Sequence, residues 1–196
     1  MLVKKLSLDI INSHIDDHIE TISLLDDDAK NRILSLSRII VSALAEGNTI
    51  FWCGNGGSAS DSQHLAGELV GRFIEERRPL KSIALNADTS VMTCIVNDYG
   101  YDYIFSRQVE ALGSKGDVLI GITTSGNSGN ILKAFEVANN LKMTTIGLLG
   151  KGGGKAKNIS HHSLIINSQS TARVQEAHIM VGHILCDLIE LGLNLK

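Results

Sequence analysis

Residues 49–64, TIFWCGNGGSASDSQH, decide the fold of this chain. The first five are rich in β-branched and aromatic side chains and lie between Asn48 and Gly54, which predicts a short buried strand over residues 49–53. A glycine-rich turn follows, and a helix is predicted over residues 58–73. We interpret this stretch as one strand, turn and helix unit of an α/β fold.

The chain on both sides of this unit continues the alternation. Apolar residues spaced three and four apart within residues 7–46 predict two helices, separated near the acidic residues 26–28. Four further strands are predicted over residues 82–84, 117–122, 144–148 and 163–166, alternating with helices over about 90–96, 103–112, 128–141 and 171–191. Such alternation predicts a three-layer α/β/α sandwich with a five-stranded parallel sheet. We expect one domain, residues 1–196, with N-terminal helices over about 1–46.

The composition excludes several classes of partner. The 196 residues are 43% hydrophobic and the formal net charge is −3. Because Lys and Arg are scattered, neither nucleic acid nor an anionic membrane is an expected partner. Cys53, Cys94 and Cys186 lie far apart, which indicates a reducing compartment. No apolar run approaches the roughly 20 residues of a membrane span, and residues 1–11 do not resemble a signal peptide, so we expect a soluble cytoplasmic protein.

Two loops have the composition of anion-binding sites. In residues 53–58, CGNGGS, glycines let backbone N–H groups approach an oxyanion, and Asn55 and Ser58 add hydrogen bonds. Residues 122–128, ITTSGNS, place four hydroxyls at the start of a helix, where N–H groups and the helix dipole favour phosphate. Each loop alone is also typical of an ordinary turn or N-cap. Neither has a nucleotide-binding fingerprint, so dinucleotides and ATP are poor candidates.

Two predicted helices carry side chains suited to a metal ion or to proton transfer. His64 and Glu68 are one helical turn apart, and Arg72 is a further turn along. In the last helix, Gln175 and His183 lie near one face. Histidine and glutamate are good ligands for zinc and similar cations, whereas glutamine is an unusual one. A histidine and a glutamate at this spacing are also common as a weak ion pair on a solvated helix, and that alternative stays open.

The other histidines are assigned no ligand role. We expect His178 to pack in the interior, and His161 and His162 to be exposed in a loop. His14 and His18 are one turn apart on the polar face of an N-terminal helix.

Five motifs occur in order along the chain. They are residues 54–64 (GNGGSASDSQH), 68–73 (ELVGRF), 97–98 (ND), 124–128 (TSGNS) and 173–183 (RVQEAHIMVGH). In sequence and spacing they closely resemble the phosphoheptose isomerases, the sedoheptulose 7-phosphate isomerases of the sugar isomerase (SIS) superfamily. The resemblance covers nearly the whole chain and implies the flavodoxin-like SIS fold.

The resemblance also implies a reaction and a site. The reaction converts sedoheptulose 7-phosphate to D-glycero-D-manno-heptose 7-phosphate, the first step of nucleotide-activated heptose biosynthesis for lipopolysaccharide or capsule. Members are homotetramers whose active sites are completed by a neighbouring subunit. Matching positions assign catalysis to Glu68 and His183, and one zinc ion per subunit to His64, Glu68, Gln175 and His183. They assign substrate binding to Asn55, Gly56, Gly57, Ser58, Glu68, Arg72, Asn97, Asp98, Thr123, Thr124, Ser125, Ser128 and Gln175.

Two positions depart from the family pattern. Thr123 stands where serine is frequent, which keeps the hydroxyl, and Ala172 stands where some members have aspartate, so it receives no catalytic role.

The mechanistic hypothesis needs a base, an acid and an electrophile. Glu68 would take the carbon-bound proton, His183 would move the proton on the O1/O2 side, and zinc would polarise the carbonyl.

The first alternative is a non-catalytic SIS-domain protein that binds the replication initiator, a class that lacks this acid and base pair. The second is a sugar-phosphate-sensing regulator or an aminosugar-phosphate isomerase domain, each of which would carry an additional domain.

Overall fold

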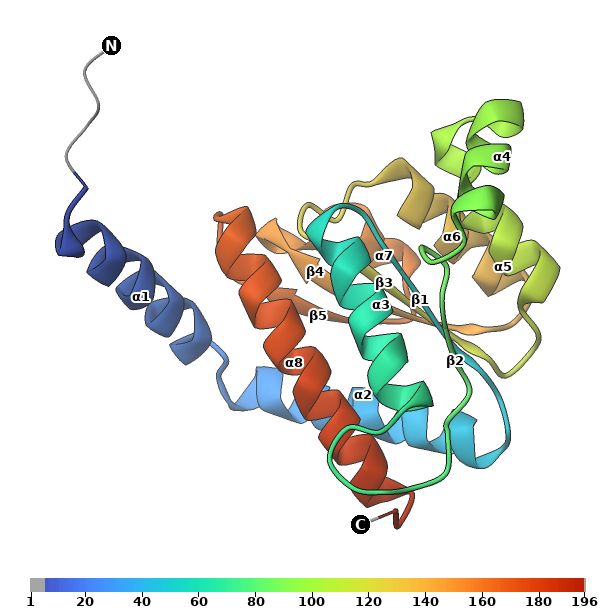
Figure 1. The fold of residues 1–196 in the computed structure, drawn as a ribbon, viewed down its shortest axis with the longest axis horizontal. Helices are drawn as coiled ribbons and strands as arrows, with labels where there is room; N and C mark the ends of the chain where they lie inside the picture. The colour runs from blue at the N-terminus through green and yellow to red at the C-terminus, as the bar shows by residue number, and fades with distance from the viewer. Residues whose placement is uncertain (1–5, 196) are drawn as a thin grey trace.

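The computed structural model describes residues 6–195, in which a parallel sheet lies between two layers of helices (Figure 1). The strands are β1 (Ile50–Gly54), β2 (Ser82–Ala84), β3 (Val118–Thr123), β4 (Thr144–Gly150) and β5 (His162–Ile166). The helices are α1 (Leu8–Ser23), α2 (Asp27–Ala45), α3 (Gly57–Val70), α4 (Thr89–Tyr99), α5 (Ser106–Leu112), α6 (Gly129–Asn140), α7 (Ala156–Ile159) and α8 (Thr171–Gly192). Two short 3-10 turns, η1 (Tyr101–Tyr103) and η2 (Lys151–Gly153), join them. The predicted three-layer fold is confirmed.

The order of the strands determines where a ligand can bind. The sheet runs β2-β1-β3-β4-β5 and every pairing is parallel. This is the flavodoxin-like order, in which the chain changes direction across the sheet between β1 and β3. Loops that leave two such strands go to opposite faces and open a crevice at the carboxyl edge. The loops after β1 and β3 are the two glycine- and serine-rich loops.

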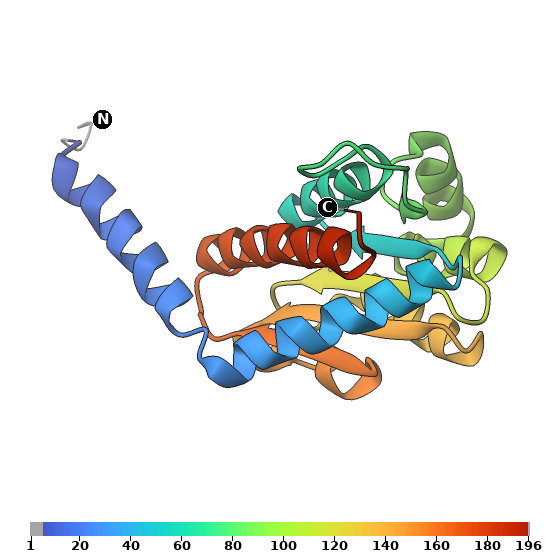
Figure 2. The same cartoon turned by 90° about the horizontal axis from the view of Figure 1, so that it is seen from below.

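Alternate residues of each strand enter two separate cores. Trp52 and Ile120 point into the core formed with α2, α3 and α8. Phe51 and Leu119 point into the opposite core, formed with α5 and α6. All four are buried, because both faces of a parallel sheet are covered by helices (Figure 2).

Helices α3 and α8 lie side by side on one face of the sheet and run in the same direction (Figure 1). Gly57 at the start of α3 lies against Gln175, and Leu65 lies against Gly182 further along both helices. A Cβ on Gly182 would come within 2.6 Å of the Leu65 methyl carbons, so glycine permits this close approach. The helix after β1 and the last helix are thereby held in one parallel register.

The N-terminal helix α1 extends away from the body of the molecule (Figures 1 and 2). Ile22 near its end packs against the core, and the rest of its contact with α8 includes polar bonds: His18 Nδ1 lies 2.7 Å from Glu176 Oε2, and Arg173 bonds both Glu176 Oε1 and the carbonyl of His14. Ile11, Ile15 and Ile19 are more than half exposed. By contrast, α2 packs into the core of its own chain.

The predicted helix over residues 58–73 is wrong at its end. α3 stops at Val70, and Arg72 therefore does not continue the His64 and Glu68 stripe. The reason is tertiary: Arg77 donates to the carbonyls of Glu68 and Gly71 and takes the place of further helical turns. The predicted helix over 103–112 begins later, at Ser106, because η1 precedes it, and α7 was not predicted.

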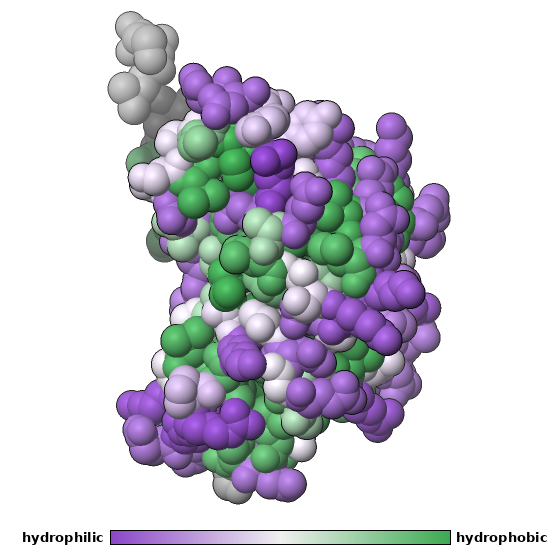
Figure 3. Space-filling model, turned by 90° about the vertical axis from the view of Figure 1, so that its right-hand side faces the viewer, coloured by the Kyte–Doolittle hydropathy of each residue, from purple (hydrophilic) through white to green (hydrophobic). Residues whose placement is uncertain are grey.

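The surface over α4 and α5 carries hydrophobic side chains in separate patches among hydrophilic ones (Figure 3). Exposed apolar residues of these helices include Val91, Val96, Tyr99 and Leu112. Within residues 6–195, no helix has both the length and the apolar character needed to cross a bilayer.

His178 packs against the sheet from α8, as expected. It is fully buried, and its Nε2 lies 3.1 Å from the carbonyl oxygen of Leu149, while its Nδ1 has no hydrogen-bond partner among residues 6–195. Burial lowers the pKa of His178 to about 4, although the bond to Leu149 opposes this shift. The imidazole is therefore neutral in the folded protein and donates from Nε2.

This buried histidine should make stability depend on pH. The unfolded chain takes up a proton near pH 6.5 and the folded chain only near pH 4, so stability is lost as the pH falls between these values. The loss amounts to about 3 kcal/mol at full effect. Urea unfolding at several pH values measures how the free energy of unfolding changes with pH. This change should be smaller in His178→Gln, which keeps a donor for Leu149, than in the exposed control His162→Gln. Equal dependence in the two variants would contradict the assignment.

Candidate functional site

The two polar loops meet at the crevice between β1 and β3. Asn55 of the first loop and Asn130 at the start of α6 bond each other twice, Nδ2 to Oδ1 at 3.0 Å and at 2.8 Å. Tyr101 of η1 also donates its hydroxyl to Asn55 Oδ1, at 2.8 Å. These bonds occupy the Asn55 carbonyl oxygen and leave one amide N–H for a ligand. Tyr101 and Asn130 were not among the residues predicted from the sequence, because they come close to Asn55 only in the folded chain.

The first loop is tightly wound. Gly56 has φ of 56°, a left-handed conformation that favours glycine. A Cβ on Gly54 would lie 2.4 Å from the carbonyl oxygen of Ser58, so the chain turns back on itself too closely for a side chain there. Ser58 is buried beneath the loop. The turn therefore leads directly from β1 into α3.

The second loop gathers hydroxyls at the N-terminus of α6. Thr123 Oγ1 lies 3.0 Å from Ser128 Oγ and 3.5 Å from Ser125 Oγ. Ser128 is the N-cap residue, but its side chain caps no backbone N–H. Asp102 lies beside the same helix end, with Oδ1 2.9 Å from the place a Cβ on Gly129 would take. The loop thus presents a hydroxyl cluster next to the positive end of a helix dipole, where one carboxylate is already present.

The glycine-rich tract after β4 supports the second loop. Gly126 has φ of 64°, and a Cβ on it would lie 2.0 Å from the carbonyl oxygen of Gly153. Asn127 bridges the two segments by accepting from the backbone N–H of Lys155 at 3.1 Å. The second loop is therefore packed against η2.

Two histidines and a glutamate converge where α3 and α8 approach each other. His64 Nε2 lies 2.8 Å from His183 Nε2 and 3.3 Å from Glu68 Oε1. One ligand atom from each of the three residues lies within 4.8 Å of the others. This contact joins residues 119 positions apart in the chain and follows from the parallel register of the two helices. The structure therefore brings His64, Glu68 and His183 together.

The three donors suit a divalent cation. Tetrahedral zinc with bonds of 2.0–2.1 Å separates its ligand atoms by about 3.3 Å. The His64 to Glu68 distance matches this value, and the two imidazole nitrogens need to separate by about 0.5 Å to reach it. At 2.8 Å, two Nε2 atoms share one proton or direct their lone pairs at a common cation.

Gln175 lies at the other end of the same helix pair. Its carboxamide packs against Gly57, where a Cβ would come within 2.6 Å of Nε2 and 3.0 Å of Oε1. Gln175 therefore contacts the first loop two turns before the histidine cluster. This contact connects the polar loop to the metal-capable group along the seam between α3 and α8.

Asp61 lies near His64 and was not among the residues predicted from the sequence. It lies one helical turn before His64 on α3, and its Oδ2 is buried without a hydrogen-bond partner among residues 6–195. Burial raises the pKa of Asp61 to about 6, and the proximity of His64 opposes the rise. The three-residue spacing, which places Asp61 and His64 near each other on a helix, was the sequence feature that could have identified Asp61.

Three predicted substrate-binding residues lie apart from these groups. Arg72 is beyond the end of α3, donates to the carbonyl of Ile74 and pairs with Glu76 at 3.7 Å. Asn97 and Asp98 bond each other at 2.7 Å near the end of α4 and make no hydrogen bond to either loop. Their predicted roles remain predictions.

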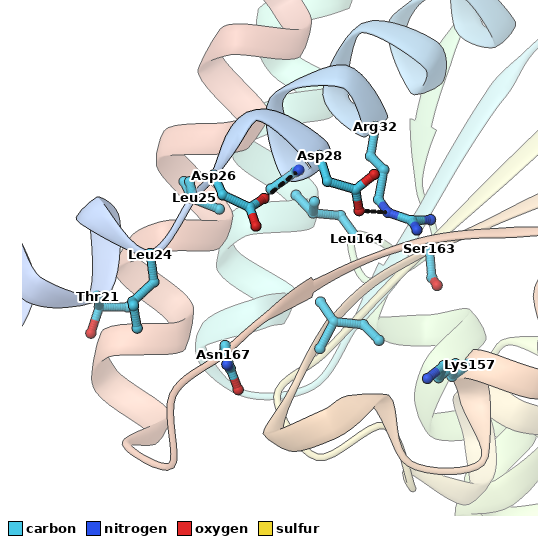
Figure 4. A pocket seen from close by; sticks show the side chains of 12 residues that line it. Thr21, Leu24, Leu25, Asp26, Asp28, Arg32, Lys157, Ser163, Leu164 and Asn167 are labelled. Carbon is cyan, nitrogen blue, oxygen red and sulfur yellow. Dashed lines mark hydrogen bonds and ion pairs between the residues drawn. The ribbon is translucent and has the colours of Figure 1, made fainter.

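One cavity of the described residues lies remote from this site. It has a volume of about 330 Å³ and lies at the other edge of the sheet, between the α1–α2 junction, β5 and α7 (Figure 4). Asp28 and Arg32 of its wall bond each other at 3.0 Å, and Leu24 and Leu164 supply apolar surface. In the single chain, the histidine cluster between α3 and α8 is instead open, with His64 about half exposed.

Comparisons with known proteins place the chain among sugar-phosphate enzymes. A model of the SIS domain family matches residues 13–150. The phosphoheptose isomerase of Nitratiruptor sp. is 50% identical over 183 residues, which cover 93% of this chain and 98% of that protein. The phosphoheptose isomerase of Aquifex aeolicus is 54% identical over 159 residues, covering 81% of this chain and 83% of that protein. A solved phosphoheptose isomerase structure from Francisella tularensis superposes with a TM-score of 0.92 at 38% identity, covering 95% of this chain and all of that one.

Gly57→Ala tests the link between the first loop and Gln175. The new methyl group should displace the carboxamide and weaken Co²⁺ or Zn²⁺ binding roughly tenfold, measured by calorimetry. Gly67→Ala is the matched control, because nothing lies within 4 Å of its Cβ position and alanine should stabilise the exposed helix by about 1 kcal/mol. Unchanged metal affinity in Gly57→Ala would show that Gln175 is not a ligand.

Proposed function

The chain belongs to the SIS domain family and, within it, to the phosphoheptose isomerases, and from this premise we propose that it interconverts sedoheptulose 7-phosphate and D-glycero-D-manno-heptose 7-phosphate. It is an enzyme of the isomerase class. The observation that carries the proposal is the identity of 50% over 93% of the chain, together with the convergence of His64, Glu68 and His183. The product would enter nucleotide-activated heptose synthesis for lipopolysaccharide or capsule.

The reaction moves a proton between C1 and C2 of the sugar while charge develops on the carbonyl oxygen. We assign removal of the carbon-bound proton to Glu68, whose carboxylate is largely sheltered and faces the seam between α3 and α8. His183 would carry the proton on the O1/O2 side. An imidazole and a carboxylate that meet at one point can serve both proton transfers of an enediol mechanism.

The phosphate would be held by the second loop. Thr123, Thr124, Ser125 and Ser128 supply hydroxyls or backbone groups there, and the N-terminus of α6 supplies a favourable dipole. Binding the phosphate far from the reacting carbons would orient C1 and C2 toward Glu68. The sugar would contact the first loop and the remaining candidates: Asn55, Gly56, Gly57, Ser58, Arg72, Asn97, Asp98 and Gln175.

We further propose that His64, Glu68, Gln175 and His183 hold zinc, which when bound would polarise the substrate carbonyl as a Lewis acid. The imidazole and carboxylate donors support this choice of metal. The oxygen of Glu68 and the nitrogen of His183 that transfer a proton would have to be free of the cation during that transfer.

A homotetramer with active sites at subunit interfaces is also part of the proposal. Two features support it: the open histidine cluster of the single chain, and the apolar stripe of Ile11, Ile15 and Ile19 on α1, each of which is more than half exposed among residues 6–195. The buried free thiols of Cys53 and Cys186 support a cytoplasmic location.

The non-catalytic alternative, a protein that binds the replication initiator, is not supported. The relatives compared above are named as isomerases, and the acid and base pair is present in this chain.

The catalytic assignment is tested by incubating the protein with sedoheptulose 7-phosphate and following aldose formation by NMR, with and without a chelator. The wild type should convert the ketose, and Glu68→Gln should lower the rate by at least about a hundredfold while still binding the sugar phosphate. Glu136→Gln, an exposed residue of α6, is the control and should keep full rate. A fully active Glu68→Gln would exclude Glu68 as the base. Absence of conversion by the wild type under both conditions would exclude the isomerase proposal.

The tetramer is tested by light scattering after size exclusion. Ile15→Lys with Ile19→Lys places two charges on the exposed apolar stripe of α1 and should shift the protein to smaller species. Leu112→Lys, a comparably exposed residue at the end of α5, should leave the mass unchanged. A tetramer that persists in the double variant would show that this stripe is not the contact.

A further inference from the structure

A buried ion pair lies at the far end of the seam between α3 and α8. Arg77 Nε and Glu190 Oε1 are 2.9 Å apart, and the exposed fractions of the two side chains are 1% and 0%. Removing two charges from water is costly, and such a pair is often no more stabilising than apolar side chains of similar size. Its position beside the helices of the candidate site therefore suggests another role.

Arg77 determines where α3 ends. Its guanidinium donates to the carbonyls of Glu68 at 2.7 Å and Leu69 at 2.8 Å. It also donates to the carbonyl of Gly71 at 3.0 Å. The last carbonyls of a helix have no intrahelical partner, and here one side chain satisfies several of them. Because Glu68 is one of these residues, the backbone that carries the proposed base is fixed by Arg77.

Glu190 fixes the loop that follows α3. It lies two turns beyond His183 on α8 and accepts from the backbone N–H of Phe73 at 3.1 Å and of Ile74 at 3.4 Å. Burial pushes the pKa of Glu190 upward, but the bonds from Phe73, Arg77 and Ile74 outweigh it and hold the pKa below its usual range. The carboxylate is therefore charged and anchors Phe73 to α8.

Phe73 is placed against the imidazole of His183 by this anchor. The two rings are stacked, with centroids 5.6 Å apart and an interplanar angle of 26°. The His183 ring also contacts the His64 ring in a T-shaped arrangement, with centroids 5.1 Å apart and an interplanar angle of 68°. Contacts with two rings limit the rotation of the His183 imidazole, whose Nε2 lies 2.8 Å from His64 Nε2.

We propose that Arg77, Glu190 and Phe73 form a positioning device that holds His183 and the end of α3 in the geometry required to bind a divalent cation. The inference rests on the proposed metal site, but its main readout is metal binding and not turnover. None of the three residues is assigned contact with substrate.

The test compares Co²⁺ affinity and the visible Co²⁺ spectrum of variants, with urea unfolding measured alongside. Phe73→Leu keeps the backbone bond to Glu190 and removes the stacked ring, and it should weaken Co²⁺ binding roughly tenfold. Phe73→Tyr restores a ring and should return the affinity to within about twofold of the wild type. Glu190→Gln should weaken binding in the same direction as Phe73→Leu. If Glu190→Gln does not fold, Phe73→Leu and Phe73→Tyr alone test the positioning role.

Phe105→Leu is the control for a simple loss of stability. Phe105 is fully buried in the core on the other face of the sheet, whereas Phe73 is only partly buried, so Phe105→Leu should lower stability at least as much as Phe73→Leu while binding Co²⁺ like the wild type. Wild-type affinity and spectrum in Phe73→Leu would overturn the inference, as would a wild-type protein that binds no Co²⁺. Co²⁺ binding without isomerisation would overturn the proposed reaction and leave the positioning device in place.

Discussion

The close parallel contact of α3 with α8 is the constraint on which the candidate site depends. Gly182 lets the side chain of Leu65 approach the α8 backbone, which allows the two helices to lie close together. In this arrangement, Gly57 meets Gln175 and His64 meets His183. A larger residue at position 182 would push the helices apart and separate donors that must lie within a few ångströms of each other.

The sheet provides the second half of the arrangement. Because strand order reverses between β1 and β3, the loops after these strands face each other, and the paired amides of Asn55 and Asn130 join them. The loop of hydroxyls and the loop of glycines are therefore joined into one continuous wall. The helix seam begins where this wall ends, at Gly57.

The sequence predicted those parts of the structure that depend on local pattern. All five strands and the seven longer helices follow from periodicity and turn residues, and the spacing of His64 with Glu68 follows from the helical repeat. The end of α3 could not be predicted, because Arg77 and Glu190 meet only in the fold and override a helical pattern that runs to Phe73. The bonds of Tyr101 and Asn130 to Asn55 were missed for the same reason. Asp61 is three residues before His64, so the helical repeat was enough to predict that it lies near this group.

The tether of α1 has a consequence for how the protein can be altered. Glu176 divides its two oxygens between His18 of the arm and Arg173, and its neighbour in α8 is Gln175. A substitution that re-orients α1 therefore displaces the turn of α8 that contacts the first loop. Changes that re-orient α1 and changes that move Gln175 are therefore coupled in this molecule, because both act on the same turn of α8.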